Sequence, residues 1–341
     1  MLEAPDLQPD LIVTCLREAY NLSNAQITFL PLGADVNTAV YRVETNDGQP
    51  YFLKARTGAF DEVSVVLPRF LNDQGIRQII PPLRTLTERL WVDLAAYRLV
   101  LYPFVAGRNG YEAKLSAHHW AEFGTVLRCV HEVTLPEALA RGIRQETYTP
   151  KYREMVRRFL EGAVVDVFVD PVAAELAAFL QARRSEIEDL VDRAERLAAV
   201  LRAQPPPLTL CHSDIHAGNL LLADDGALYI VDWDEPMMAP KERDLMYIGG
   251  ALLASGLTPE EEEALFYAAY GSVEVHPVAL AYYRYERIVQ DIAAFCEQLL
   301  LTDAGGKDRA QSLHYLKSNF LPDGTMDVAY RSDPWPRSAC R

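Results

Sequence analysis

Apolar residues recur at helical spacing near the N-terminus, and this periodicity predicts an opening helix over residues 7–20. The pattern then changes to short β-rich runs, punctuated by Gly33 and by Asn46-Asp47-Gly48. We expect strands over 26–32, 36–44, 49–55, 84–90 and 96–103, and a helix over 61–74. The front of the chain therefore predicts a small, twisted antiparallel sheet.

The pattern becomes mainly helical after Gly107, with apolar periodicity over 116–132, 152–161, 171–203, 259–270 and 277–302. The run Gln204-Pro205-Pro206-Pro207 ends one helix and leads into a short apolar strand. We therefore predict an α+β fold with two lobes. A β-rich lobe covers residues 1–104, a helical lobe covers 105–341, and a hinge lies near 102–105. The cleft between two such lobes is the natural place for a ligand.

The polar positions that interrupt the second lobe carry the strongest chemical signal. In Cys-His-Ser-Asp-Ile-His-Ala-Gly-Asn, Asp214 precedes Asn219 by five positions, and Asp232 follows in Ile-Val-Asp-Trp-Asp. Phosphoryl transfer from a nucleotide needs one carboxylate to accept the proton of the attacking hydroxyl, and an amide oxygen and a second carboxylate to hold metal ions. The order of these three residues fits that chemistry, with Asp214 as the base and Asn219 and Asp232 as Mg²⁺ ligands.

The segment between these residues predicts a β-hairpin. Apolar runs at 220–222 and 228–231 flank a turn that contains Asp225-Gly226, a strong hairpin signal. A hairpin returns Asn219 and Asp232 to one end. Each residue also has a simpler interpretation, because Asp214 could cap a helix and His212 or His216 could be core residues. The ordered set favours catalysis, and His216 could brace the loop through the backbone.

Other polar positions support a nucleotide site. Lys54 ends a short apolar strand, from which it could reach phosphates, and Glu62 is the candidate helix partner for it. The loop from Gly33 to Asn37 could present backbone N–H groups to a phosphate. The hinge residues Pro103 and Val105 could meet the base through their backbone. The simpler interpretation of Lys54 is an exposed strand-end residue, and that of Glu62 is a partner of the helix dipole.

Composition narrows the class of partner. The 341 residues are 50% hydrophobic, enough for a sizeable core, and no run of about 18 apolar residues predicts a membrane span. The net charge of −15 argues against nucleic acid and suits a cationic small molecule. Five scattered cysteines and an acidic N-terminus without a signal pattern fit the cytoplasm. The pattern says nothing of oligomeric state.

The motif segment 210–250 resembles the aminoglycoside phosphotransferase and choline kinase superfamily, whose members share the protein-kinase-like fold. The likeness extends through Gly33 to Asn37, Lys54, the hinge and the stretch 282–291, and the Trp-Asp-Glu-Pro continuation is typical of the group that phosphorylates spectinomycin. The resemblance implies an ATP- or GTP-dependent, Mg²⁺-requiring enzyme. It implies Asp214 as catalytic base, Asn219 and Asp232 as metal ligands, and Lys54 as phosphate ligand.

A site for a cationic, hydroxyl-rich acceptor needs carboxylates and aromatic walls. The candidates are Asp234, Glu235, Asp291, Trp233 and Tyr283. Asp244 is a further acidic candidate, but it could instead form a structural ion pair with Arg243 that stabilises the catalytic loop.

The sequence thus predicts an O-phosphotransferase that acts on a hydroxyl of an aminocyclitol or aminoglycoside antibiotic, with spectinomycin as the implied acceptor. One alternative is a metabolic kinase of the same fold, acting on choline, a homoserine-like amino alcohol or a sugar. Another is a non-catalytic, nucleotide-binding pseudokinase, against which the intact set of Asp214, Asn219 and Asp232 argues.

Overall fold

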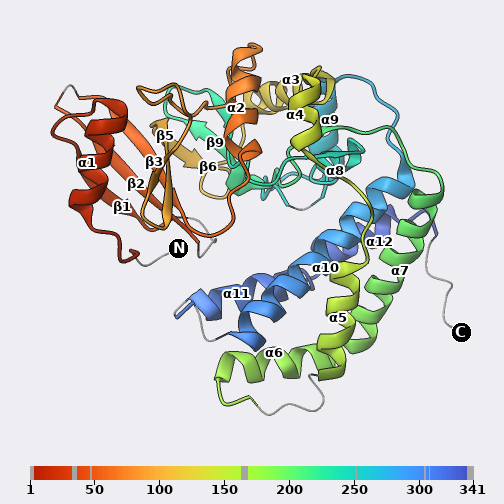
Figure 1. The fold of residues 1–341 in the computed structure, drawn as a ribbon. Coiled ribbons are helices and arrows are strands. Elements are labelled where there is room, and N and C mark those ends of the chain that lie inside the picture. The colour runs from red at the N-terminus through yellow and green to blue at the C-terminus, as the bar shows by residue number, and fades with distance from the viewer. Residues whose placement is uncertain are drawn as a thin grey trace, which may run out of the picture. The chain divides into compact units, whose positions relative to one another are not determined.

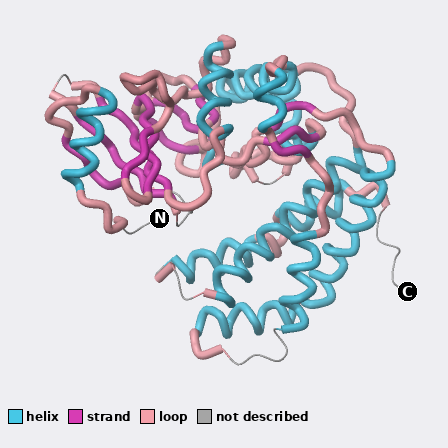
Figure 2. The backbone as a smooth tube through the Cα atoms, in the orientation of Figure 1, coloured by secondary structure: helices cyan, strands magenta, loops and turns pink. Residues whose placement is uncertain are grey.

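A computed structural model describes residues 4–32, 37–46, 48–162, 168–250, 252–302, 305–306 and 308–335. The chain divides into two compact units. The first contains residues 1–115, 133–143 and 218–236, and the second contains 116–132, 144–217 and 237–341. The predicted boundary between residues 104 and 105 stays a prediction. The helices and strands of both units are drawn in Figures 1 and 2.

The first unit contains a five-stranded antiparallel sheet in the order β1-β2-β3-β5-β4. Its strands are β1 (Gln26–Leu30), β2 (Thr38–Glu44), β3 (Pro50–Arg56), β4 (Val92–Leu94) and β5 (Tyr97–Pro103). The predicted strands over 26–32, 36–44, 49–55 and 96–103 are confirmed within a few residues, and so is the small antiparallel sheet. Pairing of Lys54 with Val40 on one side and Val100 on the other sets the register of the central strand.

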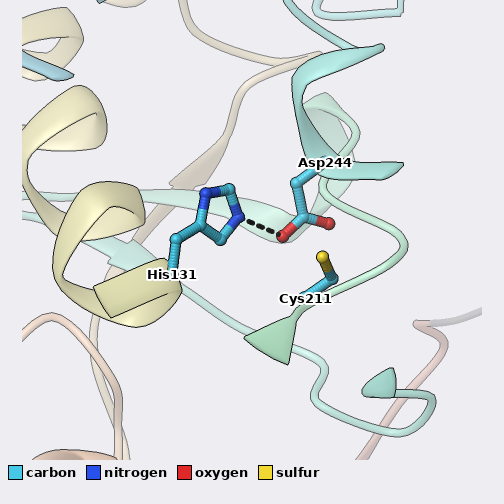
Figure 3. Close-up of side chains that lie close together, drawn as sticks. All are labelled: His131, Cys211 and Asp244. Carbon is cyan, nitrogen blue, oxygen red and sulfur yellow. Dashed lines mark hydrogen bonds and ion pairs between the residues drawn. The ribbon is translucent and has the colours of Figure 1, made fainter. Parts of the chain in front are cut away.

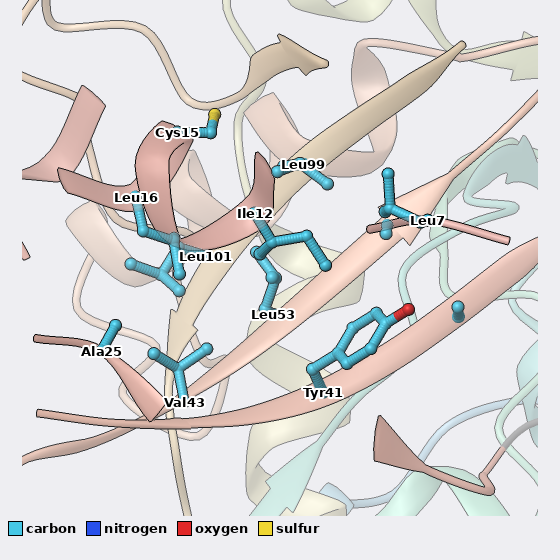
Figure 4. Close-up of a cluster of buried hydrophobic side chains, with 12 residues drawn as sticks. Leu7, Ile12, Cys15, Leu16, Ala25, Tyr41, Val43, Leu53, Leu99 and Leu101 are labelled. Atoms are coloured by element: carbon cyan, nitrogen blue, oxygen red, sulfur yellow. The ribbon is translucent and has the colours of Figure 1, made fainter. Parts of the chain in front are cut away.

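The helix α1 (Pro9–Tyr20) packs its apolar stripe on this sheet, which confirms the predicted opening helix. Ile12 and Leu16 of α1 are fully buried with Val43, Leu53 and Leu99 of the strands (Figure 4). The strand residues alternate between this core and the opposite side of the sheet, as the period of two requires. Lys54, between Leu53 and Ala55, therefore lies on the side of the sheet away from α1.

The predicted strand over 84–90 is wrong. Thr85 forms a turn instead: its side-chain hydroxyl accepts hydrogen bonds from the backbone N–H groups of Thr87 and Arg89, and Glu88 takes a positive φ of 63°. A threonine hydroxyl competes with the ladder for backbone donors, and that local chemistry outweighs the alternating pattern. The paired strand begins later, at Val92.

The first unit also contains α2 (Val63–Asp73), α4 (Glu137–Gly142), and a small sheet of β10 (Leu228–Ile230), β9 (Leu220–Ala223) and β6 (Gly107–Asn109). The predicted hairpin is confirmed, because β9 and β10 pair antiparallel with Leu222 opposite Leu228. Gly226 supplies the turn with a φ of +89°, which L side chains rarely adopt.

The second unit is mainly helical. Its helices are α3 (Ala117–Glu132), α5 (Lys151–Gly162), α6 (Pro171–Ala182), α7 (Arg184–Ala203), α8 (Glu242–Leu245), α9 (Pro259–Tyr270), α10 (Pro277–Leu301), α11 (Asp308–Ser318) and α12 (Thr325–Ser332). The predicted helical stretches are confirmed, although 171–203 forms two helices rather than one. A short sheet joins β7 (Arg144–Gln145), β11 (Met237–Ala239) and β8 (Thr209–Cys211). The strand expected after the proline run is confirmed as β8, whereas the sequence pattern did not predict β7 and β11.

The long helix α10 forms the centre of this unit, in contact with α5, α7, α8 and α12 (Figure 1). Its tyrosines Tyr282, Tyr283 and Tyr285 are almost fully buried. The helices α3 and α9 approach closely at Gly124, where a Cβ would lie 2.6 Å from the carbonyl oxygen of Phe266. Within the described ranges, no helix is both long and apolar enough to cross a bilayer.

Candidate active site

The first unit brings Lys54 together with two carboxylates of the motif. Lys54 Nζ lies 2.9 Å from Asp232 Oδ1 and 2.7 Å from Asp234 Oδ2, and Arg56 lies 3.0 Å from Asp234 Oδ1. Burial disfavours the ammonium of Lys54, but Asp232 and Asp234 outweigh it and raise the pKa of this lysine. Lys54 is therefore a permanent cation beside Asp232, whose side chain remains about half exposed.

The hairpin places Asn219 beside this cluster. The backbone N–H of Val231 donates to the carbonyl of Asn219 at 3.0 Å, and Leu220 pairs with Ile230. Asn219 and Asp232 therefore lie at the same end of the hairpin, as its two apolar runs predicted. Asp232 has a positive φ of 65°, a backbone conformation that residues other than glycine adopt mainly where surrounding contacts enforce it.

The remaining nucleotide candidates fall at different places in the first unit. Asn37 precedes β2 and is exposed, its carbonyl accepting the N–H of Thr57 at 2.9 Å, while Gly33 lies outside the described residues. Pro103 ends β5, and Val105 follows it in a partly exposed segment. Glu62 is exposed ahead of α2, and the ion pairs of Lys54 that the structure shows go to other carboxylates. A pairing of Glu62 with Lys54 stays a prediction.

In the second unit, Asp214 lies in a network of its own. Its Oδ1 accepts hydrogen bonds from the guanidinium of Arg287 and from the hydroxyl of Tyr247, the latter at 3.0 Å. His216 Nε2 lies 3.6 Å from Oδ2. Burial works against ionisation of Asp214, yet Arg287 and His216 hold its pKa well below the usual range. Asp214 is therefore an ionised acceptor at neutral pH.

The loop that carries Asp214 is fixed by Asp244 of α8. Asp244 is fully buried, and its two oxygens accept the backbone N–H groups of His212 at 2.9 Å and Ser213 at 2.7 Å. Ser213 has a φ of 77°, which is unfavourable for a residue with a side chain. The sequence is compatible with Asp244 either as an acceptor-binding carboxylate or as a structural ion pair with Arg243. The structure favours a structural role, but Asp244 binds the backbone of the loop rather than Arg243.

His131, at the end of α3, completes this anchor (Figure 3). Its Nε2 lies 3.1 Å from Asp244 Oδ2, and its Nδ1 lies 2.7 Å from the hydroxyl of Tyr270. The sulfur of Cys211 comes within 4.8 Å of the same atoms, a grouping of metal-ligand types. Burial raises the pKa of the Cys211 thiol, and metals bind the thiolate. Because both Asp244 oxygens already accept hydrogen bonds, we interpret the group as a structural anchor.

The candidate acceptor residues fall into three groups. Trp233 and Tyr283 are buried: the indole N–H of Trp233 donates to the Ile230 carbonyl, and the ring of Tyr283 lies under the guanidinium of Arg243. Asp234 is bound to Lys54 and Arg56, as described above. Only Glu235 and Asp291 of this set are neither buried nor committed to Lys54, with Glu235 exposed and Asp291 beside Arg287.

Sequence reasoning missed Arg287, Tyr247 and His131 as functional residues. Arg287 stood only within the stretch 282–291, and its spacing of four from Asp291 was the one available signal. Tyr247 and His131 carried no local signal, since a single aromatic or histidine among apolar residues is typical of a core.

Comparison with known proteins decides the family. A family model described as the phosphotransferase enzyme family matches residues 28–282, well over half of the chain. The chain belongs to this phosphotransferase family.

Solved structures support the assignment of the chain to this family. The crystal structure of a spectinomycin phosphotransferase, APH(9)-Ia, in complex with ADP and spectinomycin is 36% identical, with a TM-score of 0.90 over 96% of this chain and 99% of that one. The AMP-bound complex of the same enzyme is 35% identical, with a TM-score of 0.85 over 95% and 98%. The resemblance stated from the motifs is confirmed.

A more distant structure, an ethanolamine kinase from Plasmodium vivax, is 14% identical with a TM-score of 0.64, over 96% of this chain and 92% of that one, and shows the fold alone. The predicted protein-kinase-like fold is confirmed. A search of curated proteins found no match. The phosphotransferase is thus a nucleotide-binding enzyme that transfers phosphate to hydroxyl groups.

Proposed function

We propose that this phosphotransferase moves the γ-phosphate of ATP, with Mg²⁺, to a hydroxyl of a cationic aminocyclitol, with spectinomycin as the acceptor. The observation that carries the proposal is the 36% identity, over 96% of the chain, to a phosphotransferase solved with ADP and spectinomycin. The distantly related kinases share only the fold, so they do not favour a metabolic acceptor over spectinomycin.

The residues fit a magnesium-bound nucleotide. Asn219 and Asp232 supply an amide oxygen and a carboxylate at one end of the hairpin, and hard oxygen ligands are those that Mg²⁺ prefers. The partly exposed carboxylate of Asp232 is accessible to an ion. Bound there, Mg²⁺ would neutralise charge on the phosphates. Lys54 would bind the same phosphates, because its ammonium lies 2.9 Å from Asp232 and is permanently charged.

Asp214 would act on the acceptor. Its carboxylate is ionised, so it accepts a hydrogen bond from the acceptor hydroxyl and aims the oxygen at the γ-phosphorus. A bond forms between that oxygen and phosphorus as the bond to the bridging oxygen of the leaving nucleoside diphosphate breaks. The hydroxyl proton passes to Asp214. No covalent enzyme intermediate is needed, since positioning and charge neutralisation lower the barrier.

The charge of the chain supports a cationic acceptor. A net charge of −15 attracts polycations by raising their local concentration, and the carboxylate of Asp291 lies near Asp214 through their shared contact with Arg287. Glu235 is exposed and could contribute a second carboxylate. Trp233 and Tyr283 are buried, so we do not expect their rings to touch the acceptor.

Mass spectrometry of spectinomycin after incubation with the enzyme, Mg²⁺ and ATP tests the proposal. We expect a gain of one phosphate, dependent on the metal and absent with the Asp214→Asn variant. Parallel reactions with GTP, choline, ethanolamine and homoserine measure nucleotide and acceptor choice. Phosphorylation of one of these amino alcohols with unmodified spectinomycin would overturn the acceptor and keep the phosphotransferase.

A further inference from the structure

Arg287 is in direct contact with Asp214 and has no part in the mechanism above. It belongs to α10, and its guanidinium donates to Asp214 Oδ1 from NH1. The same nitrogen donates to the hydroxyl of Tyr247 at 3.0 Å, and this hydroxyl donates to Asp214 Oδ1. Arg287, Tyr247 and one oxygen of Asp214 thus form a closed triangle of hydrogen bonds within the second unit.

Other contacts hold Arg287 in this place. Its Nε donates to Asp291 Oδ1 at 3.0 Å, one helical turn further along α10. The other oxygen of Asp291 accepts from the side-chain amide of Asn319 at 3.3 Å. Tyr247 is fully buried, so its ring cannot swing away. The arginine is therefore fixed by two independent partners and braces Asp214 from one side.

The titratable and charged groups around Asp214 come from three segments. His212 and His216 flank it in the loop, with the Asp214 N–H donating to His212 Nδ1 at 3.3 Å. Tyr247 faces it from the segment after α8, and α10 contributes Arg287 with Asp291 behind it. Burial raises the pKa of the Tyr247 hydroxyl, which stays a donor. Arg287 is the one permanent cation among these groups, and it contributes most to the lowered pKa of Asp214.

We propose that Arg287 is a positioning residue that binds one oxygen of Asp214 and turns the other toward the acceptor hydroxyl. This inference rests on the proposed role of Asp214. Phosphoryl transfer passes through a loose transition state in which the attacking oxygen has formed little bond, so a strong base gains little before the proton moves. An oriented, ionised acceptor serves that reaction better, and Arg287 supplies both properties.

The test compares Arg287→Gln with wild type and with Arg284→Gln as a matched control. Arg284 lies on the same helix and donates to the carbonyls of Met246 and Ile248, at 3.3 and 2.8 Å, without touching Asp214. Each variant is measured for kcat/KM against pH and by ¹³C NMR titration of the Asp214 carboxyl, assigned with Asp214→Asn. Asp214 must be deprotonated to accept the proton. Removing Arg287 should therefore raise the midpoint of the acidic limb of the kcat/KM profile, and the midpoint of the NMR titration, by about one pH unit or more.

We expect Arg284→Gln to leave both curves where wild type has them, and Arg287→Gln to lower kcat more than it raises KM. Arg287→Lys keeps the positive charge but loses the planar guanidinium with its paired donors. It should therefore raise the midpoint of the NMR titration by less than Arg287→Gln does. It also serves if Arg287→Gln does not fold. An unmoved titration in both Arg287 variants overturns the inference.

The NMR titration needs no acceptor, so it reports on Arg287 even if spectinomycin proves not to be the substrate. Full activity of Asp214→Asn would instead overturn the catalytic role of Asp214, and with it the proposed mechanism, whatever the titration shows.

Discussion

Replacing Asp244 by asparagine tests how the catalytic loop is held. The carboxylate accepts three hydrogen bonds, from the N–H groups of His212 and Ser213 and from His131, in a fully buried place. Asparagine has nearly the same shape but one amide NH₂ in place of an oxygen. That NH₂ must face a donor, whichever way the side chain turns, because donors surround both carboxylate oxygens.

The magnitude follows from these contacts. A hydrogen bond to a charged group contributes about 1.5–3 kcal/mol, and a buried donor left without an acceptor costs about 1–3 kcal/mol. Asp244→Asn loses the charge from all three bonds and leaves at least one donor unpaired, so we expect the free energy of unfolding to fall by about 3 kcal/mol. Ser213 then loses the contact that enforces its φ of 77°, and kcat should fall with little change in KM.

Urea denaturation followed by circular dichroism measures the first quantity, and steady-state kinetics measure the second. Glu262→Gln is the matched control, because Glu262 is also buried and accepts a backbone N–H, from Gly249 at 2.8 Å. We expect a comparable loss of stability there with kcat unchanged. A loss below about 1 kcal/mol for Asp244→Asn, or equal effects of both variants on kcat, would refute the reasoning.

Three further changes separate the roles of single groups. Asp214→Ala should lower turnover by about 10³-fold or more and leave nucleotide binding nearly intact, as measured by kinetics and titration calorimetry. Asp232→Ala should abolish the Mg²⁺-dependent part of nucleotide binding in the same calorimeter; retained dependence on Mg²⁺ would contradict its role. Burial raises the pKa of Glu286 to about 7 from 4.5 against the pull of Arg153, so the folded protein holds a proton that the unfolded chain releases. Stability should therefore decline as pH rises through this interval, and Glu286→Gln should flatten that slope in urea denaturation across pH 4.5 to 7.

The sequence alone was sufficient wherever the structure depends on neighbours in the chain. The apolar runs around Asp225-Gly226 determined the hairpin, and with it the return of Asp232 to Asn219. Helical periodicity located the major helices, and β-rich runs located four of the five strands of the first sheet. These features are local, because side-chain period and turn chemistry act over a few residues.

Reasoning from local sequence patterns failed where a side chain forms contacts that the pattern does not reveal. Thr85 bonded to nearby backbone and turned a strand-like pattern into a turn. The ion pairs of Lys54 with Asp232 and Asp234 were not predicted either, because they join residues nearly 180 positions apart in the chain. Spacing in sequence carries no information on contacts of that range.

What the sequence by itself determined was the class of chemistry, because an aspartate, an asparagine and a second aspartate in this order are typical of protein-kinase-like phosphoryl transfer and rarely arise from packing. Tertiary structure alone decided how those groups are tuned. Arg287 lies 73 residues from Asp214 and Asp244 lies 31 residues from Ser213, yet Arg287 lowers the pKa of Asp214 and Asp244 holds the loop that carries it. Charge and hydrogen-bond donors act through distance in space, and only the folded chain sets that distance.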